Sequence, residues 1–202
     1  MAIVVVGGHS RNIGKTSVVC ALIAATSERH WTAIKITQCS HDQAGKEPCD
    51  CELAGQAIAI SEERDSKAAT DSSRYLGAGA TRSLWVRSRQ GGLAEAMPRI
   101  RAEIADVENV ILESNRVLEF LEPDLYLSLL DPHIRDFKAS ALQYLSRADA
   151  ILILPGSVKE AEWPEGARRS IEHITRFQIA PPDSAPRELV KFVMQRLSSR
   201  RR

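Results

Sequence analysis

The chain has 202 residues, of which 44% are hydrophobic and 26% are charged, and its 27 basic and 26 acidic side chains leave a formal net charge of +1. This composition is ordinary for a globular protein and excludes a disordered or fibrous chain. The near-neutral charge gives no bulk field for nucleic acid or an anionic membrane surface, so we expect neither partner. No apolar run approaches the roughly 20 residues that cross a bilayer, and no signal peptide is evident, which predicts a cytoplasmic protein.

Short β-rich runs alternate with segments of helical periodicity along the chain. We predict strands over residues 2–6, 31–37, 83–87, 109–113, 125–130, 150–154 and 176–180. We predict helices over residues 15–27, 69–76, 93–105, 137–146 and 187–197. This alternation implies crossover connections and a parallel sheet covered on both faces. The sequence therefore predicts an α/β fold, with one doubly wound, three-layer domain over residues 1–202 and a mostly parallel sheet of about seven strands.

A glycine-rich segment, GGHSRNIGKTS over residues 7–17, joins the first predicted strand to the first predicted helix. In that context it is predicted to be a phosphate-binding loop (P-loop), which turns backbone amides toward a polyphosphate at the positive end of a helix dipole. The residues expected to bind the nucleotide are Gly8, Asn12, Ile13, Gly14, Lys15, Thr16 and Ser17. The alternative is a glycine-rich turn followed by a surface lysine. The P-loop reading predicts a fold of the P-loop NTPase type.

Two candidate catalytic residues follow from this loop and from a later strand. Lys15 supplies an ammonium to the phosphates, and the neighbouring Thr16 hydroxyl is expected to ligate Mg²⁺. Glu113 ends an apolar strand, and ligands of doubly wound sheets gather at the carboxyl ends of strands. We therefore expect Glu113 to hold the Mg²⁺ or to orient an attacking nucleophile, the alternative being a solvated charge. No base-reading motif follows the sixth predicted strand, so GTP and ATP both stay open as the ligand.

Residues 38–67 are predicted to form a long irregular loop, which in a compact domain is usually functional. This loop carries four metal-ligating side chains, Cys39, His41, Cys49 and Cys51. Three thiolates and an imidazole suit zinc, and the thiolates could also hold an iron-sulfur cluster. The alternative is that these thiols have no role in a reducing compartment.

The P-loop has five residues between Gly8 and Gly14, where the usual pattern has four, or else His9 stands in the place of the first glycine. The longer spacing resembles the dethiobiotin synthetase branch of P-loop proteins. Residues 71–80, DSSRYLGAGA, have the form D-S-x-R-x-x-x-A-G-A. With the P-loop and the strand over residues 33–36, this motif resembles the molybdopterin-guanine dinucleotide biosynthesis adapter (MobB) family, small P-loop proteins of the SIMIBI class. The resemblance covers residues 2–113. It departs from the family where Ser114 and Asn115 replace the glycine after the acid.

The MobB resemblance implies GTP binding, weak hydrolysis, homodimerisation and a partner protein in cofactor biosynthesis, the enzyme that attaches a nucleotide to molybdopterin. It places Asp71 and Arg74 in the nucleotide site and gives Glu113 the place of the family's acid. From the residues alone, Asp71 and Arg74 could equally be a surface pair on a short packed helix.

Three functions stay open. The first is a slow NTPase that assists metallocofactor assembly. The second is an enzyme of the dethiobiotin synthetase type, which transfers the γ-phosphate to a small carboxylate or carbamate substrate. The third is a metal-binding module with a vestigial P-loop.

Overall fold

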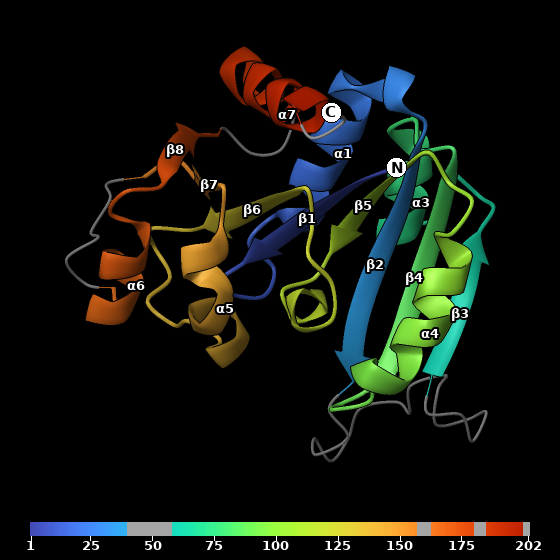
Figure 1. Ribbon diagram of the computed structural model, residues 1–202, viewed down its shortest axis with the longest axis horizontal. Helices are drawn as coiled ribbons and strands as arrows, with labels where there is room; N and C mark the ends of the chain where they lie inside the picture. The colour runs from blue at the N-terminus through green and yellow to red at the C-terminus, as the bar shows by residue number, and fades with distance from the viewer. Residues whose placement is uncertain (40–57, 157–162, 180–184, 200–202) are drawn as a thin grey trace.

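Eight strands form one sheet in the residues that the structure describes, 1–39, 58–156, 163–179 and 185–199 of this computed structural model. The strands are β1 (Ala2–Gly8), β2 (Trp31–Cys39), β3 (Ile58–Glu63), β4 (Arg82–Arg89), β5 (Asn109–Glu113), β6 (Leu125–Leu130), β7 (Ala150–Ile153) and β8 (Thr175–Gln178). Their order is β3-β4-β2-β5-β1-β6-β7-β8, with β8 at the left and β3 at the right of Figure 1. Every neighbouring pair is parallel except β3 with β4.

The predicted doubly wound, mostly parallel α/β fold is thus confirmed, but the predicted number of strands is too low. The additional strand, β3, lies inside the segment predicted to be irregular and pairs with β4 from Ile58 opposite Ser88 to Glu63 opposite Ser83. Residues 38 and 39 also belong to a strand, β2. The prediction of one irregular loop over residues 38–67 is therefore wrong at 38–39 and 58–63, and residues 40–57 lie outside the described part of the chain.

Helices connect the strands and cover the sheet. The α-helices are α1 (Lys15–Ala25), α3 (Asp71–Gly77), α4 (Leu93–Glu103), α5 (Ala139–Tyr144), α6 (Glu165–Ile171) and α7 (Arg187–Ser199), and short 3-10 helices are η1 (Ser27–Arg29), η2 (Arg116–Glu119) and η3 (Leu145–Arg147). Helix α6 is absent from the sequence prediction because it is short and buries only Ala167 and Ile171. No helix in the described segments combines the length and apolar character that a bilayer crossing demands.

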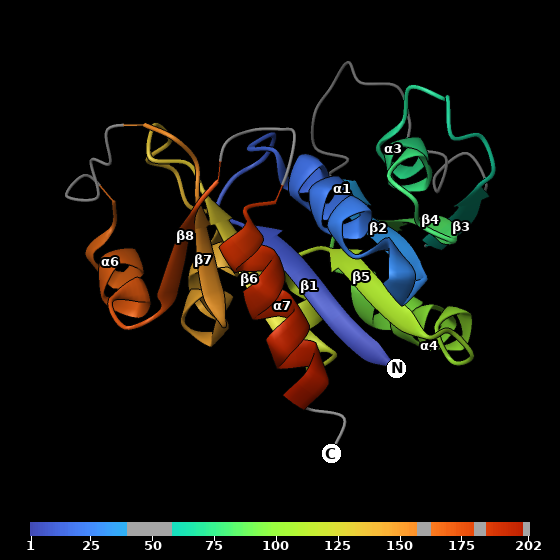
Figure 2. The same cartoon turned by 90° about the horizontal axis from the view of Figure 1, so that it is seen from above.

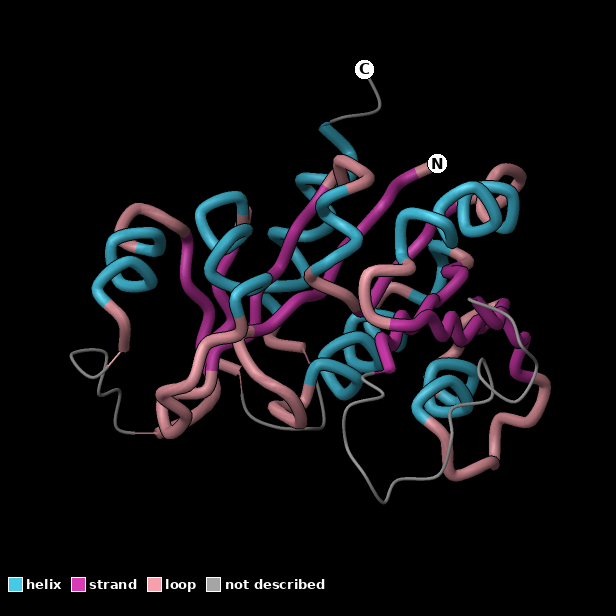
Figure 3. Tube along the Cα trace, turned by 90° about the horizontal axis from the view of Figure 1, so that it is seen from below, coloured by secondary structure: helices cyan, strands magenta, loops and turns pink. Residues whose placement is uncertain are grey.

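The helices form two layers, one on each face of the sheet. One apolar core joins side chains of α1, α3 and α7 to the sheet, and a second joins side chains of α4, η2, η3 and α6 to the opposite face. Figure 2 shows α1 and α7 in front of the strands, and Figure 3 shows the opposite side. The predicted three-layer architecture follows from these two cores.

Strand β1 explains why the P-loop lies where the layers meet. Val4 and Val6 pack into the core under α1, whereas Val5 packs into the core on the other face. This alternation of apolar residues is what burial on both faces requires of a central parallel strand. The strand ends at Gly8, between the carboxyl ends of its neighbours β5 and β6.

Candidate functional site

The loop between β1 and α1 depends on two glycines for different reasons. Gly14 has φ +91°, a left-handed conformation that strains any residue with a Cβ. A Cβ on Gly8 would lie 2.8 Å from Cδ1 of Ile13 and 3.1 Å from the carbonyl oxygen of Leu129. Asn12 also has a positive φ, 56°, which asparagine tolerates better than most residues. The loop therefore needs glycine at position 14 for its backbone conformation and glycine at position 8 for lack of space.

The start of the loop is fastened to the end of β5 by Asn115. Its amide nitrogen donates to the Gly8 carbonyl at 2.8 Å, and its Oδ1 accepts from the Gly8 amide at 2.9 Å. This contact of Asn115 is not predicted from the sequence, although an asparagine immediately after a buried strand is a usable signal. The two hydrogen bonds fix the loop relative to Glu113, two residues earlier.

The N-terminus of α1 is open to an anion. No side chain in the described part of the chain caps Gly14, and the first turn of α1 contains no acidic residue, so neither occupies the amides there. The Lys15 ammonium folds back to donate to the Ser10 carbonyl at 2.8 Å, which holds it inside the curve of the loop. Burial lowers the pKa of Lys15 from its usual value. A backbone cradle and a half-buried ammonium thus face the same space, as phosphate binding requires.

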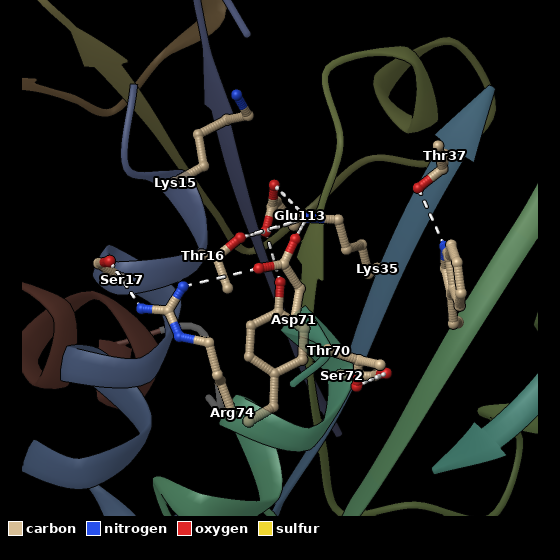
Figure 4. A network of polar contacts seen from close by, with 12 residues as sticks. Lys15, Thr16, Ser17, Lys35, Thr37, Thr70, Asp71, Ser72, Arg74 and Glu113 are labelled. Atoms are coloured by element: carbon tan, nitrogen blue, oxygen red, sulfur yellow. Dashed lines mark hydrogen bonds and ion pairs between the residues drawn. The ribbon is translucent and has the colours of Figure 1, made fainter. Parts of the chain in front are cut away.

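A polar network lies beside this cradle and joins two helices, α1 and α3, to two strands, β2 and β5 (Figure 4). Thr16 Oγ1 donates to Glu113 Oε2 at 2.7 Å. The Lys35 ammonium, on β2, lies 3.2 Å from Thr16 Oγ1 and 3.3 Å from Glu113 Oε1, and it forms an ion pair with Asp71. Glu113 is only 7% exposed, so the alternative of a solvated charge at a strand end is wrong.

Helix α3 supplies the other side of the network. Tyr75, fully buried, donates from its hydroxyl to Glu113, and burial followed by the Glu113 charge raises the pKa of this phenol well above its usual value. Arg74 donates to Ser17 Oγ at 2.9 Å and lies 3.6 Å from Asp71. The motif over residues 71–80 therefore reaches the P-loop helix, and its Asp71 and Arg74 are not merely a pair with each other.

The oxygen atoms of Thr16, Glu113 and Asp71 fit a small divalent cation. A hydroxyl and two carboxylates are hard oxygen ligands of the type that Mg²⁺ prefers. The same three side chains already surround one cation, the Lys35 ammonium. Lys35 is not predicted from the sequence as a site residue, but a lysine between two isoleucines in a strand next to β5 is the signal that could have identified it.

One cavity of about 720 Å³ contains this arrangement. Nine of the ten predicted P-loop, motif and acid residues line it, namely Gly8, Asn12, Gly14, Lys15, Thr16, Ser17, Asp71, Arg74 and Glu113. The exception is Ile13, whose side chain is buried beneath Gly8. Arg116 and Lys138, which the sequence analysis does not name, also line the cavity.

The predicted cysteine and histidine site lies outside the described part of the chain. Only the backbone of Cys39 is described, as the last residue of β2, and His41, Cys49 and Cys51 belong to residues 40–57. Within the described residues, no group of three or more histidine, cysteine, aspartate or glutamate side chains could hold a metal ion. Zinc or iron-sulfur binding by those four residues stays a prediction.

Comparison with solved structures finds similar folds at low identity. The chain is similar to HypB from Helicobacter pylori in complex with nickel, with a TM-score of 0.48 and 15% identity over 99% of this chain and 87% of that one. It is similar to LpxK from Aquifex aeolicus in complex with ATP, with a TM-score of 0.48 and 20% identity over 88% of this chain and 53% of that one. It is also similar to the Zn(II)-bound triple mutant of the YjiA GTPase, with a TM-score of 0.43 and 11% identity over 94% of this chain and 60% of that one.

This chain thus spans about half the length of LpxK and three fifths of that of YjiA. No protein-family model and no curated protein matches the chain. The assignment of the fold as that of P-loop nucleotide-binding proteins therefore depends on the geometry of residues 8–16 and of the parallel sheet that carries them.

Proposed function

We propose that this chain binds a nucleoside triphosphate together with Mg²⁺ on the P-loop and hydrolyses it slowly. The observation that supports the proposal is the shared position of the uncapped N-terminus of α1, the Lys15 ammonium and the Thr16–Glu113 hydrogen bond. In this proposal the Lys15 ammonium exchanges the neutral Ser10 carbonyl for a charged phosphate oxygen. The exchange adds a direct attraction between opposite charges to the hydrogen bond, so it is favourable.

Thr16 and Glu113 would hold Mg²⁺, with Asp71 beside them. Bound Mg²⁺ would neutralise charge on the phosphate oxygens. The Glu113 carboxylate accepts from Thr16 and Tyr75 on Oε2 and contacts the Lys35 ammonium through Oε1. A carboxylate held by three donors is suited to holding a cation and poorly suited to removing a proton from a nucleophile. We therefore assign Glu113 to cation binding.

Lys35 would act on the phosphates as a second ammonium. Its side chain lines the cavity, so the ammonium can turn from Asp71 and Glu113 to a phosphate oxygen once another cation satisfies the two carboxylates. Positioned cations that meet charge developing on the transferred phosphoryl group are the main device of phosphoryl transfer. Lys15 would supply that charge from the start of α1 and Lys35 from β2.

The MobB resemblance supports a role as a slow NTPase that assists metallocofactor assembly, as a homodimer with a partner protein. Such a protein hydrolyses nucleotide slowly alone and faster when the partner supplies groups in trans. The second candidate is transfer of the γ-phosphate to a small anionic substrate. It is favoured by the cavity, which continues past the P-loop to Arg116 and Lys138. An enzyme of this kind would turn over at roughly 1–1,000 per second once given its acceptor.

The test is thermal stabilisation by nucleotide. We expect ATP or GTP with Mg²⁺ to raise the melting temperature of the wild-type protein, because a ligand that binds only the folded state stabilises it. Lys15→Ala should abolish this shift and leave the ligand-free protein folded, whereas Lys191→Ala, on the exposed side of α7, should keep it. An equal shift in Lys15→Ala and wild type would overturn the site assignment, and no shift in wild type would favour the reading of a vestigial P-loop.

A further inference from the structure

The cavity at the P-loop carries more positive charge than a nucleotide needs. Among the described residues, two carboxylates line it, Asp71 and Glu113, and both belong to the network around Lys35. Six described cationic side chains line the same cavity, so the formal charge of its described lining is four units positive; they are Arg11, Lys15, Lys35, Arg74, Arg116 and Lys138. A nucleoside triphosphate with its Mg²⁺ brings only about two negative charges. Within the described lining, about two positive charges therefore remain without a counter-charge.

Lys138 is the more informative of the excess cations because it is held in place without a carboxylate. Burial, followed by the nearby charges of Lys15 and Arg11, lowers its pKa to about 8. Among the described residues, no carboxylate lies within ion-pair distance of its ammonium. Partial burial of an unpaired ammonium is unfavourable, so the fold must hold it there by other contacts.

Those contacts come from the P-loop itself. The backbone amide of Lys138 donates to the His9 carbonyl at 2.9 Å. The His9 ring is fully buried, lies 3.2 Å from the Ile134 carbonyl through Nε2, and packs against Phe137 at a centroid distance of 4.6 Å. The segment that carries Lys138 is thus fixed to His9 of the P-loop.

Arg116 approaches the loop from the other neighbouring strand. It begins η2 and follows Asn115, which forms both hydrogen bonds to Gly8. Gly8 therefore has a cation on each side, Arg116 after β5 and Lys138 after β6, and both face the cavity. Neither belongs to the loop that cradles the phosphates or to the network that would hold Mg²⁺.

We propose that Arg116 and Lys138 bind the carboxylate or phosphate group of a second ligand, in the part of the cavity beside the terminal phosphate of the nucleotide. This inference rests on the proposed function, because the excess positive charge is what remains after the charge of a bound Mg-nucleotide is subtracted. The chemistry recognised is a small anion of about two negative charges. A ligand of that class would complete the charge balance of the cavity and relieve the unpaired Lys138 ammonium.

The test separates the two sites by filling the first. The nucleotide site is saturated with Mg²⁺ and the β,γ-imido analogue of ATP or GTP, and inorganic phosphate or succinate is then titrated by calorimetry. We expect saturable binding of at least one of the two anions to wild type. The double variant Arg116→Gln/Lys138→Gln should bind it at least about tenfold more weakly, since each cation contributes a charged hydrogen bond. Arg168→Gln, an exposed arginine on α6, is the matched control and should change nothing.

Absence of phosphate and succinate binding in wild type, or equal binding in the double variant, would overturn the proposal. Preference for phosphate or for succinate distinguishes the two sources of the anion. Failure of the proposed function is seen separately, as failure of the nucleotide analogue to bind. In that case the anions are titrated into the Lys15→Ala variant, which lacks the P-loop ammonium, and into the same variant with the Arg116 and Lys138 substitutions added. Anion binding that depends on Arg116 and Lys138 would still support the second site.

Discussion

The Thr16 hydroxyl, in the first turn of α1, donates a 2.7 Å hydrogen bond to the Glu113 carboxylate at the end of β5, 97 residues later. Both side chains are less than a tenth exposed. The bond ties the helix that follows the P-loop to the strand that carries the acid, so the phosphate cradle and the candidate cation ligands move together. A change at either residue is therefore expected to affect both binding and stability.

We expect Glu113→Gln to abolish the dependence of nucleotide binding on Mg²⁺. The substitution keeps the shape of the side chain but removes the charge that would hold the cation, and its amide cannot accept from Thr16, Tyr75 and Lys35 together. Loss of a buried charged acceptor should lower the free energy of unfolding by roughly 1–3 kcal/mol. Calorimetry with and without Mg²⁺ measures the first effect, and urea unfolding measures the second.

The control for that prediction is Glu119→Gln, an exposed glutamate at the end of η2. It should leave both the Mg²⁺ dependence and the unfolding free energy unchanged. If Glu113→Gln keeps a Mg²⁺ dependence equal to that of wild type, the carboxylate does not hold the cation.

Lys35→Met should strengthen the binding of a divalent cation in the absence of nucleotide. The Lys35 ammonium lies among oxygens of Thr16, Asp71 and Glu113, and a divalent cation must displace it to reach them. Without the ammonium the carboxylates lack a counter-charge, so the variant should be less stable and should bind Mn²⁺ about tenfold or more tightly. Electron paramagnetic resonance with Mn²⁺ measures the affinity directly.

A matched control for the lysine is Lys191→Met, on the solvent side of α7. It should bind Mn²⁺ as wild type does. Equal Mn²⁺ affinities for Lys35→Met and wild type would show that the ammonium does not compete for these oxygens.

The central strands could be predicted closely from the sequence because their apolar runs are buried on both faces. The bounds of β5 and β6 agree with the prediction at both ends, and every residue of both strands is buried. Strand β3 could not be predicted in the same way. Its pattern is mixed, with Ile58 buried and Glu62 exposed, and it exists through antiparallel pairing with β4, which local periodicity does not reveal.

The candidate site likewise has a part that the sequence predicts and a part that it does not. The P-loop is a continuous motif, so the spacing of the sequence alone predicts Gly8, Gly14 and Lys15 as site residues. Helix α1 ends earlier than periodicity predicts because Thr26 leaves the helical conformation and its hydroxyl donates to the Leu22 carbonyl. The contacts of Lys35 with Glu113 join residues 78 apart, and such a contact depends on the order of the strands.

Anion binding in the cavity should weaken as the pH rises through about 8. The pKa of Lys138 lies at about 8 in the folded protein and near 10.5 in its ordinary state, so the folded protein loses this proton first. Between these values the unfolded chain holds more protons, and unfolding free energy therefore rises with pH over that window. Lys138→Gln should remove this part of the rise, and Lys138→Arg should keep anion binding constant to higher pH. A phosphate affinity in Lys138→Arg that falls as steeply as in wild type would assign the titration to another group.

Acidification should destabilise the protein through His9. Burial lowers the pKa of this histidine below its usual 6.5, and the ring fits its surroundings as a neutral group, with Nδ1 accepting from the Asp131 amide at 3.5 Å and Nε2 beside the Ile134 carbonyl. Below pH 6.5 the unfolded chain takes up this proton more readily than the folded protein does. The neutral ring therefore contributes its full stability above pH 6.5, and this contribution falls as the pH is lowered. Urea unfolding at several values between pH 7.5 and about 5 should show a steeper loss in wild type than in His9→Gln, although the variant starts from a lower stability at pH 7.5. His173→Gln, an exposed histidine after α6, should keep the slope of wild type. If His9→Gln kept that slope as well, the loss of stability in acid would belong to other titrating groups. The contacts between residues 131–138 and the P-loop would then not depend on the charge state of His9.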